Sequence, residues 1–143
     1  MDTAQIDSTT LRDRRMGFAI LRIILGINML GRSMVRIPEL NEFASGMAGN
    51  FADTILPAPF VHVYAFVIVF AEAVIGVLLI AGWKTRWALL TMGILLATLT
   101  FGMLLQQNFG TVANILIYTI AVAFLLFNTR YDYFGVDRGF RVR

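Results

Sequence analysis

Four long apolar stretches divide the chain, and most of the polar residues fall between them. A helix needs about 20 mostly apolar residues to cross the hydrocarbon layer of a membrane. The stretches of that length are residues 16–35, 60–81, 87–105 and 109–127. Each is too long for a strand, and no ten-residue alternation indicates an outer-membrane barrel. The pattern therefore predicts an all-α fold, namely an integral membrane four-helix bundle.

The connections between these stretches carry turn-forming residues. Residues 82–86, with the sequence Gly-Trp-Lys-Thr-Arg, predict a tight polar hairpin, and residues 106–108 separate the third stretch from the fourth. The longest connection, residues 37–59, holds all three prolines and is expected to be a loop. We therefore expect short turns between the last three helices and one long loop after the first.

The basic residues predict the orientation of the bundle. With four crossings, nine lysines and arginines fall on the side of the two termini, whereas the other side has Arg36 and three acids. Because cytoplasmic loops carry an excess of Lys and Arg, both termini are predicted to be cytoplasmic. The chain then divides into a cytoplasmic N-terminal segment at residues 1–15, a transmembrane domain at residues 16–130 and a basic cytoplasmic tail at residues 131–143.

The composition supports a membrane protein and excludes several kinds of site. Hydrophobic residues make up 58% of the 143 residues and charged residues 15%, which is too few charges to cover a soluble globule. The absence of cysteine excludes disulfides, thiolate metal sites and iron–sulfur ligation within this chain. A single histidine excludes bis-histidine haem ligation. We therefore expect no haem, iron–sulfur cluster or metal in this chain.

Ionisable residues inside the predicted spans indicate an ion pair or a functional site, because a charge in hydrocarbon is costly. At 1.5 Å per residue from the cytoplasmic end, Arg22 lies about 9 Å deep and Glu72 about 15 Å deep. The gap of about 6 Å is within reach of an arginine side chain. An intramembrane ion pair between Arg22 and Glu72 is therefore predicted.

A second polar group is predicted in the outer half of the bundle. Arg32 and Asn114 both fall about 24 Å from the cytoplasmic edge. Tyr118 lies one turn inward from Asn114, near the level of Asn28, and His62 lies farther out. If the helices pack in sequence order, these groups converge on one interior pocket. The plainer alternatives are a structural ion pair, interhelical hydrogen bonds through the asparagines, and a histidine that faces water.

Three stretches of sequence resemble a known family. Residues 21–26 read Leu-Arg-Ile-Ile-Leu-Gly, and residues 56–59 read Leu-Pro-Ala-Pro. Residues 70–88 contain Glu72, a long apolar run and the turn Gly-Trp-Lys-Thr-Arg. Together these stretches resemble the DoxX family (DoxX/DoxD-like) of small prokaryotic membrane proteins.

The resemblance implies a four-helix membrane bundle with Arg22 and Glu72 at the family's buried charged positions. Some members look like quinone-linked subunits of oxidoreductases, as in the small-subunit type of thiosulfate:quinone oxidoreductase. The resemblance also implies a multi-pass protein in the plasma (inner) membrane of a bacterium or archaeon.

Three functional hypotheses follow. In the first, the protein is a small membrane subunit of a respiratory or redox complex that contacts a quinone in the intramembrane pocket. Glu72 would relay protons, and the ligand-binding residues would be Arg32, Asn114, Tyr118, Asn28 and His62. In the second, it is a non-catalytic membrane anchor or assembly subunit. In the third, it is a small-molecule carrier or channel, which would require an oligomer, because four helices alone leave only a narrow pore, and the sequence shows no inverted repeat.

The sequence lacks the motifs of several common catalytic sites. It has no phosphate-binding loop, dinucleotide fingerprint, nucleophile elbow or zinc-protease motif. The chain is therefore not expected to be catalytic alone. Its expected partners are the lipid bilayer and other subunits of a membrane complex, or further copies of itself, with no nucleic acid.

Overall fold

The computed structural model describes residues 3–139, which form helices joined by short connections. In this part of the chain, four helices are long and apolar enough to cross a membrane: α1 (Thr3–Arg36), α3 (Ala58–Ala81), α4 (Thr85–Leu105) and α5 (Phe109–Phe127). No strand occurs within residues 3–139. The prediction of an all-α bundle with four membrane-spanning helices is confirmed.

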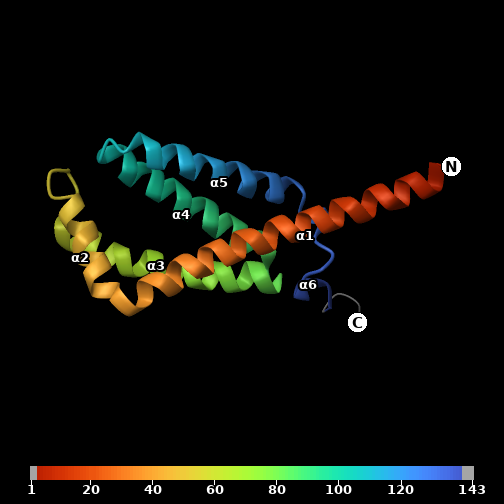
Figure 1. Cartoon of the computed structure of the whole chain (residues 1–143), viewed down its shortest axis with the longest axis horizontal. Helices are drawn as coiled ribbons and strands as arrows, with labels where there is room; N and C mark the ends of the chain where they lie inside the picture. Colours follow the sequence, from red (N-terminus) through yellow and green to blue (C-terminus); the bar gives the residue numbers. More distant parts are fainter. Residues whose placement is uncertain (1–2, 140–143) are drawn as a thin grey trace.

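The four long helices pack in sequence order. α1 packs on α3, α3 on α4 and α4 on α5, whereas α5 makes little contact with α1 (Figure 1). At 1.5 Å per residue, the 34 residues of α1 extend about 51 Å, well beyond the roughly 30 Å of a bilayer core. Its N-terminal part accordingly projects past the ends of the other helices (Figure 1).

The helix ends have local causes in the sequence. Pro59 lies in the first turn of α3, where its missing N–H costs nothing. The same helix ends at Gly82, whose φ of 66° is readily accessible to glycine, and the N–H of Trp83 turns back to the Leu78 carbonyl. The side chain of Asn108 caps α5 by accepting a hydrogen bond from the Thr111 N–H at 3.1 Å.

α1 and α3 are in contact through their backbones. A Cβ placed on Gly76 would lie 2.6 Å from the backbone nitrogen of Leu30, and one on Gly26 would lie 3.0 Å from the Gly76 carbonyl oxygen. Only glycine allows two helices to approach so closely, and small residues at such crossings are typical of membrane helices. This contact fixes the vertical register of α1 against α3.

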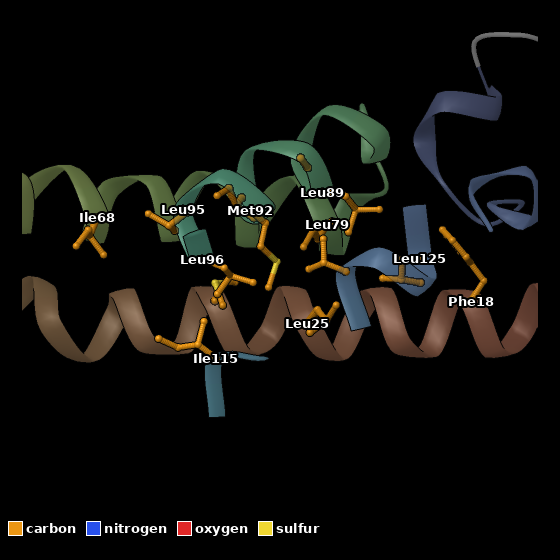
Figure 2. Close-up of a cluster of buried hydrophobic side chains, with 14 of the residues drawn as sticks. Phe18, Leu25, Ile68, Leu79, Leu89, Met92, Leu95, Leu96, Ile115 and Leu125 are labelled. Atoms are coloured by element: carbon orange, nitrogen blue, oxygen red, sulfur yellow. The ribbon is translucent and has the colours of Figure 1, made fainter. Parts of the chain in front are cut away.

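Apolar side chains from all four long helices fill the half of the bundle nearest the chain ends. Leu25 of α1, Leu79 of α3 and Met92 of α4 belong to this buried cluster, which extends toward Phe18 (Figure 2). The outward faces are also apolar: Phe127, for example, is 84% exposed. An apolar exterior around an apolar core is the arrangement that a lipid solvent favours.

The long connection at residues 37–59 is not the loop that was expected. It contains a 3₁₀ turn, η1 (Ile37–Glu39), and an eleven-residue helix, α2 (Leu40–Asn50), which packs on α3. α2 covers the end of the bundle opposite the chain ends (Figure 1). Ala44 of α2 and Phe51, the residue directly after it, are both buried. Beyond α5, the turn η2 (Thr129–Tyr131) and the short α6 (Val136–Gly139) lie at the other end.

Candidate functional site

A cavity with a volume of about 890 Å³ lies in the half of the bundle covered by α2. Its walls come from the last turns of α1, from α2, from the middle of α3, from the second half of α4 and from the first half of α5. Ile68 and Ile115 belong both to the buried apolar cluster and to the cavity wall, so the cavity begins where the core ends. We call this space the arginine cavity, after Arg32 and Arg36 in its wall.

The arginine cavity borders a cluster of three charges around one buried carboxylate. The Glu72 carboxylate is fully buried and accepts a hydrogen bond of 2.7 Å from Nη1 of Arg36. Its other oxygen lies 3.5 Å from Nη2 of Arg32. The two arginine side chains are 25% and 34% exposed. One carboxylate therefore faces two guanidinium groups, and the cluster carries one net positive charge at the cavity wall.

The opposite wall presents uncharged polar groups. Asn114 and Tyr118, one helical turn apart on α5, both line the cavity, as do Gln106 and Thr111. The Asn28 amide donates a hydrogen bond of 3.3 Å to the Tyr118 hydroxyl, which links α1 to α5 where these helices otherwise touch little.

The cavity offers donors from two sides and apolar walls between them. No acidic residue is among those the structure places along its lining. The guanidinium groups are hydrogen-bond donors without acceptor capacity, while amides and hydroxyls can donate or accept. The arrangement suits a molecule with a flat apolar body and electron-rich oxygens.

The predicted ion pair between Arg22 and Glu72 is wrong. Arg22 is buried, with 1% of its surface exposed, but Nη1 lies 3.3 Å from Oδ1 of Asp132. Its other amino group, Nη2, donates to the Phe134 carbonyl at 3.4 Å. Arg22 thus binds the segment that follows α5, whereas Glu72 binds the last turns of α1.

The error came from the vertical register of the helices. Taking residues 16 and 82 as the same membrane edge placed Arg22 near Glu72. In the structure the Arg22 guanidinium packs against Gly82, where a Cβ would lie only 1.7 Å from Nη1. Gly82 is ten residues beyond Glu72, which is about 15 Å along the helix. Arg22, which lies at Gly82, is therefore too far from Glu72 to pair with it. Arg36 lies beside Glu72 instead.

The predicted ligand-binding residues are only partly brought together. Arg32, Asn114 and Tyr118 line the arginine cavity. Asn28 is not in its lining, but it contacts the cavity indirectly through Tyr118. His62 is not in the lining either; its ring lies 5.4 Å from the ring of Phe66 on α3.

Sequence reasoning missed two partners of the buried charges. Arg36 was counted with the outer loop, although it lies four residues after Arg32 and therefore on the same helical face. Its guanidinium also lies 4.6 Å from the ring centre of Phe43 on α2, an attractive cation–π contact. Asp132 was assigned to the tail, and no local pattern indicates that it returns to Arg22.

A second polar cluster lies at the end of the bundle near the chain ends. Arg14 donates a hydrogen bond of 2.8 Å to the Tyr131 hydroxyl. This bond, together with the charge of Arg130, lowers the pKa of Tyr131 below its ordinary value of 10.0. Asp137 accepts from the Thr85 N–H at 3.3 Å at the start of α4. These contacts fasten the chain after α5 onto the bundle.

The family comparison assigns the chain. A family model described as methylamine utilisation protein MauE matches residues 14–114, from the N-terminal part of α1 to Asn114 in α5. A comparison with curated proteins and one with solved structures each gave no match. Because the match covers most of the chain, the protein belongs to the MauE family and is a multi-pass membrane protein.

The match overturns the resemblance to the DoxX family. Two glycines on which that resemblance depended have packing functions in this structure. Gly26 lies at the contact between α1 and α3, and Gly82 ends α3 and makes room for Arg22. Such functions can recur in any compact helical membrane bundle, so these residues do not discriminate between families.

Proposed function

We propose that this MauE-family protein is a small membrane component of a methylamine utilisation system, or of a related redox system, and that it binds a quinone headgroup in the arginine cavity. The family description supplies the first part of the proposal. The second part depends on one observation: hydrogen-bond donors on α1 and on α5 face a common space within the apolar span.

A quinone has the chemistry that these walls complement. Its ring is flat and apolar, and its two carbonyl oxygens accept hydrogen bonds from opposite sides. One oxygen would accept hydrogen bonds from the guanidinium groups of Arg32 and Arg36. The other would accept them from the side chains of Asn114 and Tyr118. The volume of about 890 Å³ lies within the usual range of roughly 300–1,000 Å³ for small-molecule sites.

The proposal gives Glu72 a positioning role. Glu72 does not line the cavity, and both of its oxygens face arginines. A carboxylate in that position holds the two guanidinium groups at the wall and reduces the cost of keeping them in hydrocarbon. The remaining positive charge favours an electron-rich oxygen in the cavity.

Binding of a tailless quinone tests the proposal. The probe is 2,3-dimethoxy-5-methyl-1,4-benzoquinone, titrated onto the whole protein in nanodiscs of quinone-free lipid. Asn114→Leu and Tyr118→Phe should each weaken binding about tenfold, because each removes one hydrogen bond. Asn41→Leu on the exposed face of α2 and Tyr133→Phe beyond α5 are matched controls and should leave the affinity unchanged.

Absence of saturable binding in the wild-type protein would overturn the quinone proposal. It would favour the alternative, a non-catalytic anchor or assembly subunit, in which the buried charges only hold the bundle together. In that case, changing Arg32 and Arg36 to methionine and Glu72 to leucine in one variant should leave assembly with partner subunits intact, because no unpaired charge remains.

A further inference from the structure

A second, almost wholly apolar hollow of about 430 Å³ lies between α3 and α4 beneath α2. Phe60 and Val61 of α3 form one wall, and Ala97 and Phe101 of α4 form the other. Phe60 and Phe101 are 58% and 55% exposed, so this groove opens on the outer surface of the bundle. On that surface the solvent is lipid. We call it the tail groove.

The few polar groups of the tail groove are already satisfied within the protein. The Thr98 hydroxyl donates to the Leu95 carbonyl at 2.8 Å and is hydrogen-bonded to the Tyr64 hydroxyl. Both side chains therefore have partners, and the groove presents no free charge to an occupant. Its occupant must be hydrocarbon.

The tail groove and the arginine cavity are neighbours. Met47, Leu99 and Met103 line both of them, and all three side chains are half-buried. Two of these three are methionines, which are unbranched and adapt their shape easily. The partition between the polar cavity and the apolar groove is thus thin and deformable.

We propose that the occupant of the two spaces is a single amphipathic molecule, an isoprenoid quinone. Its headgroup lies in the arginine cavity and its tail crosses the partition at Met47 and Met103 into the tail groove. The tail then leaves between α3 and α4 into the bilayer, which is also the route by which the molecule enters. This inference rests on the proposed quinone function and adds the class of quinone and its path.

The tail gains little from the hydrophobic effect, because lipid chains are as apolar as the groove. Its contribution comes from contacts with fixed side chains and from being tethered to a bound headgroup, which raises its local concentration. A lipid acyl chain without such a headgroup has only the first of these advantages. The tail should therefore add a moderate gain in affinity, about tenfold.

The test compares quinones with and without a tail in the same nanodiscs. In the wild-type protein, a quinone with three isoprenoid units should displace the bound tailless probe at about one tenth of the concentration that the unlabelled tailless quinone requires. Ala97→Phe fills the groove from α4 and should remove this advantage while leaving the affinity for the tailless quinone unchanged. Ala113→Phe, an identical change at an exposed position of α5 outside both spaces, should keep the advantage.

A tail-end diazirine provides a second measurement on the wild-type protein, so that the test does not depend on folding of the variant. The expected adducts lie on α3 and α4, at peptides that contain Tyr64 or Phe101. Adducts confined to α1 and α5, or no effect of the tail on affinity, would overturn the inference and leave the proposed function standing. Failure of the tailless quinone to bind at all would overturn both.

Discussion

Among single residues, Glu72 is in a position where a charge is energetically costly. Its carboxylate is fully buried in a membrane-spanning helix, and the guanidinium groups of Arg32 and Arg36 lie beside it. Breaking a buried pair costs more than the pair contributes, because an uncompensated charge remains in a medium of low polarity. Here two arginines would lose their common partner at once.

We expect Glu72→Gln to destabilise the protein by about 3 kcal/mol. This is the lower end of the usual range, since both guanidinium groups are partly exposed and can be solvated. The measurement is reversible unfolding in mixed detergent micelles. Glu42→Gln, at an exposed position of α2, is the matched control and should change stability little. Equal effects of the two changes would show that the cluster has no structural role.

The sequence predicted the presence of buried charges but not their partners. Arg22 and Glu72 are both buried, as expected, yet each pairs with a residue that had been assigned to a loop or tail. Depth along a helix can be counted from the sequence, but the offset between two helices depends on how their surfaces fit. An offset of a few residues is enough to exchange Arg22 for Arg36 beside Glu72.

Among the helices, the contact of α1 with α3 fixes that offset. Gly26 and Gly76 remove the side chains that would hold the backbones apart. With these helices in register, Arg36 reaches Glu72 at one end and Arg22 reaches Gly82 at the other. The positions of the charges therefore follow from the position of the glycines.

We expect Gly76→Ala to destabilise the protein by about 1–3 kcal/mol, because its Cβ would meet the backbone of Leu30 at 2.6 Å. The measurement is the thermal unfolding midpoint in detergent. Gly31→Ala on α1 is the comparison, since a Cβ there has open space within 4 Å. If both variants melted at the same temperature, the close approach of α1 and α3 would be ruled out as a determinant of the fold.

The long helices were predictable and the short one was not. Three of the four predicted spans end within two residues of the observed helices α3, α4 and α5, because apolar runs and turn residues are local signals. α2 is only eleven residues long, contains two glycines and was hidden in a connection with three prolines. α2 is stabilised by its packing on α3, which cannot be predicted from its own sequence.

For the whole molecule, the distribution of basic residues determines which way the bundle is expected to face. The contacts of Arg14 with Tyr131 and of Arg22 with Asp132 place the beginning and end of the described chain at the same end of the bundle. Most of the basic residues lie at that end, so it is predicted to be cytoplasmic. The arginine cavity and the tail groove would then lie in the outer half of the membrane.

The absence of native cysteine makes this orientation simple to measure. Ser45→Cys on α2 and Lys84→Cys in the turn before α4 each introduce a single reactive thiol at an exposed position. An impermeant maleimide applied to intact cells should label Ser45→Cys and spare Lys84→Cys, whereas both should react after lysis. The reverse pattern would place the cavity in the cytoplasmic half.

The most direct test of the account is the quinone content of the protein itself. The protein is purified in mild detergent from membranes that contain quinone, and the bound quinone is extracted and quantified per polypeptide. We expect close to one quinone per chain in the wild-type protein. In the Asn114→Leu, Tyr118→Phe double variant we expect no more than an unrelated membrane protein of similar size retains. Wild-type protein that retained no more than that unrelated protein would contradict the account.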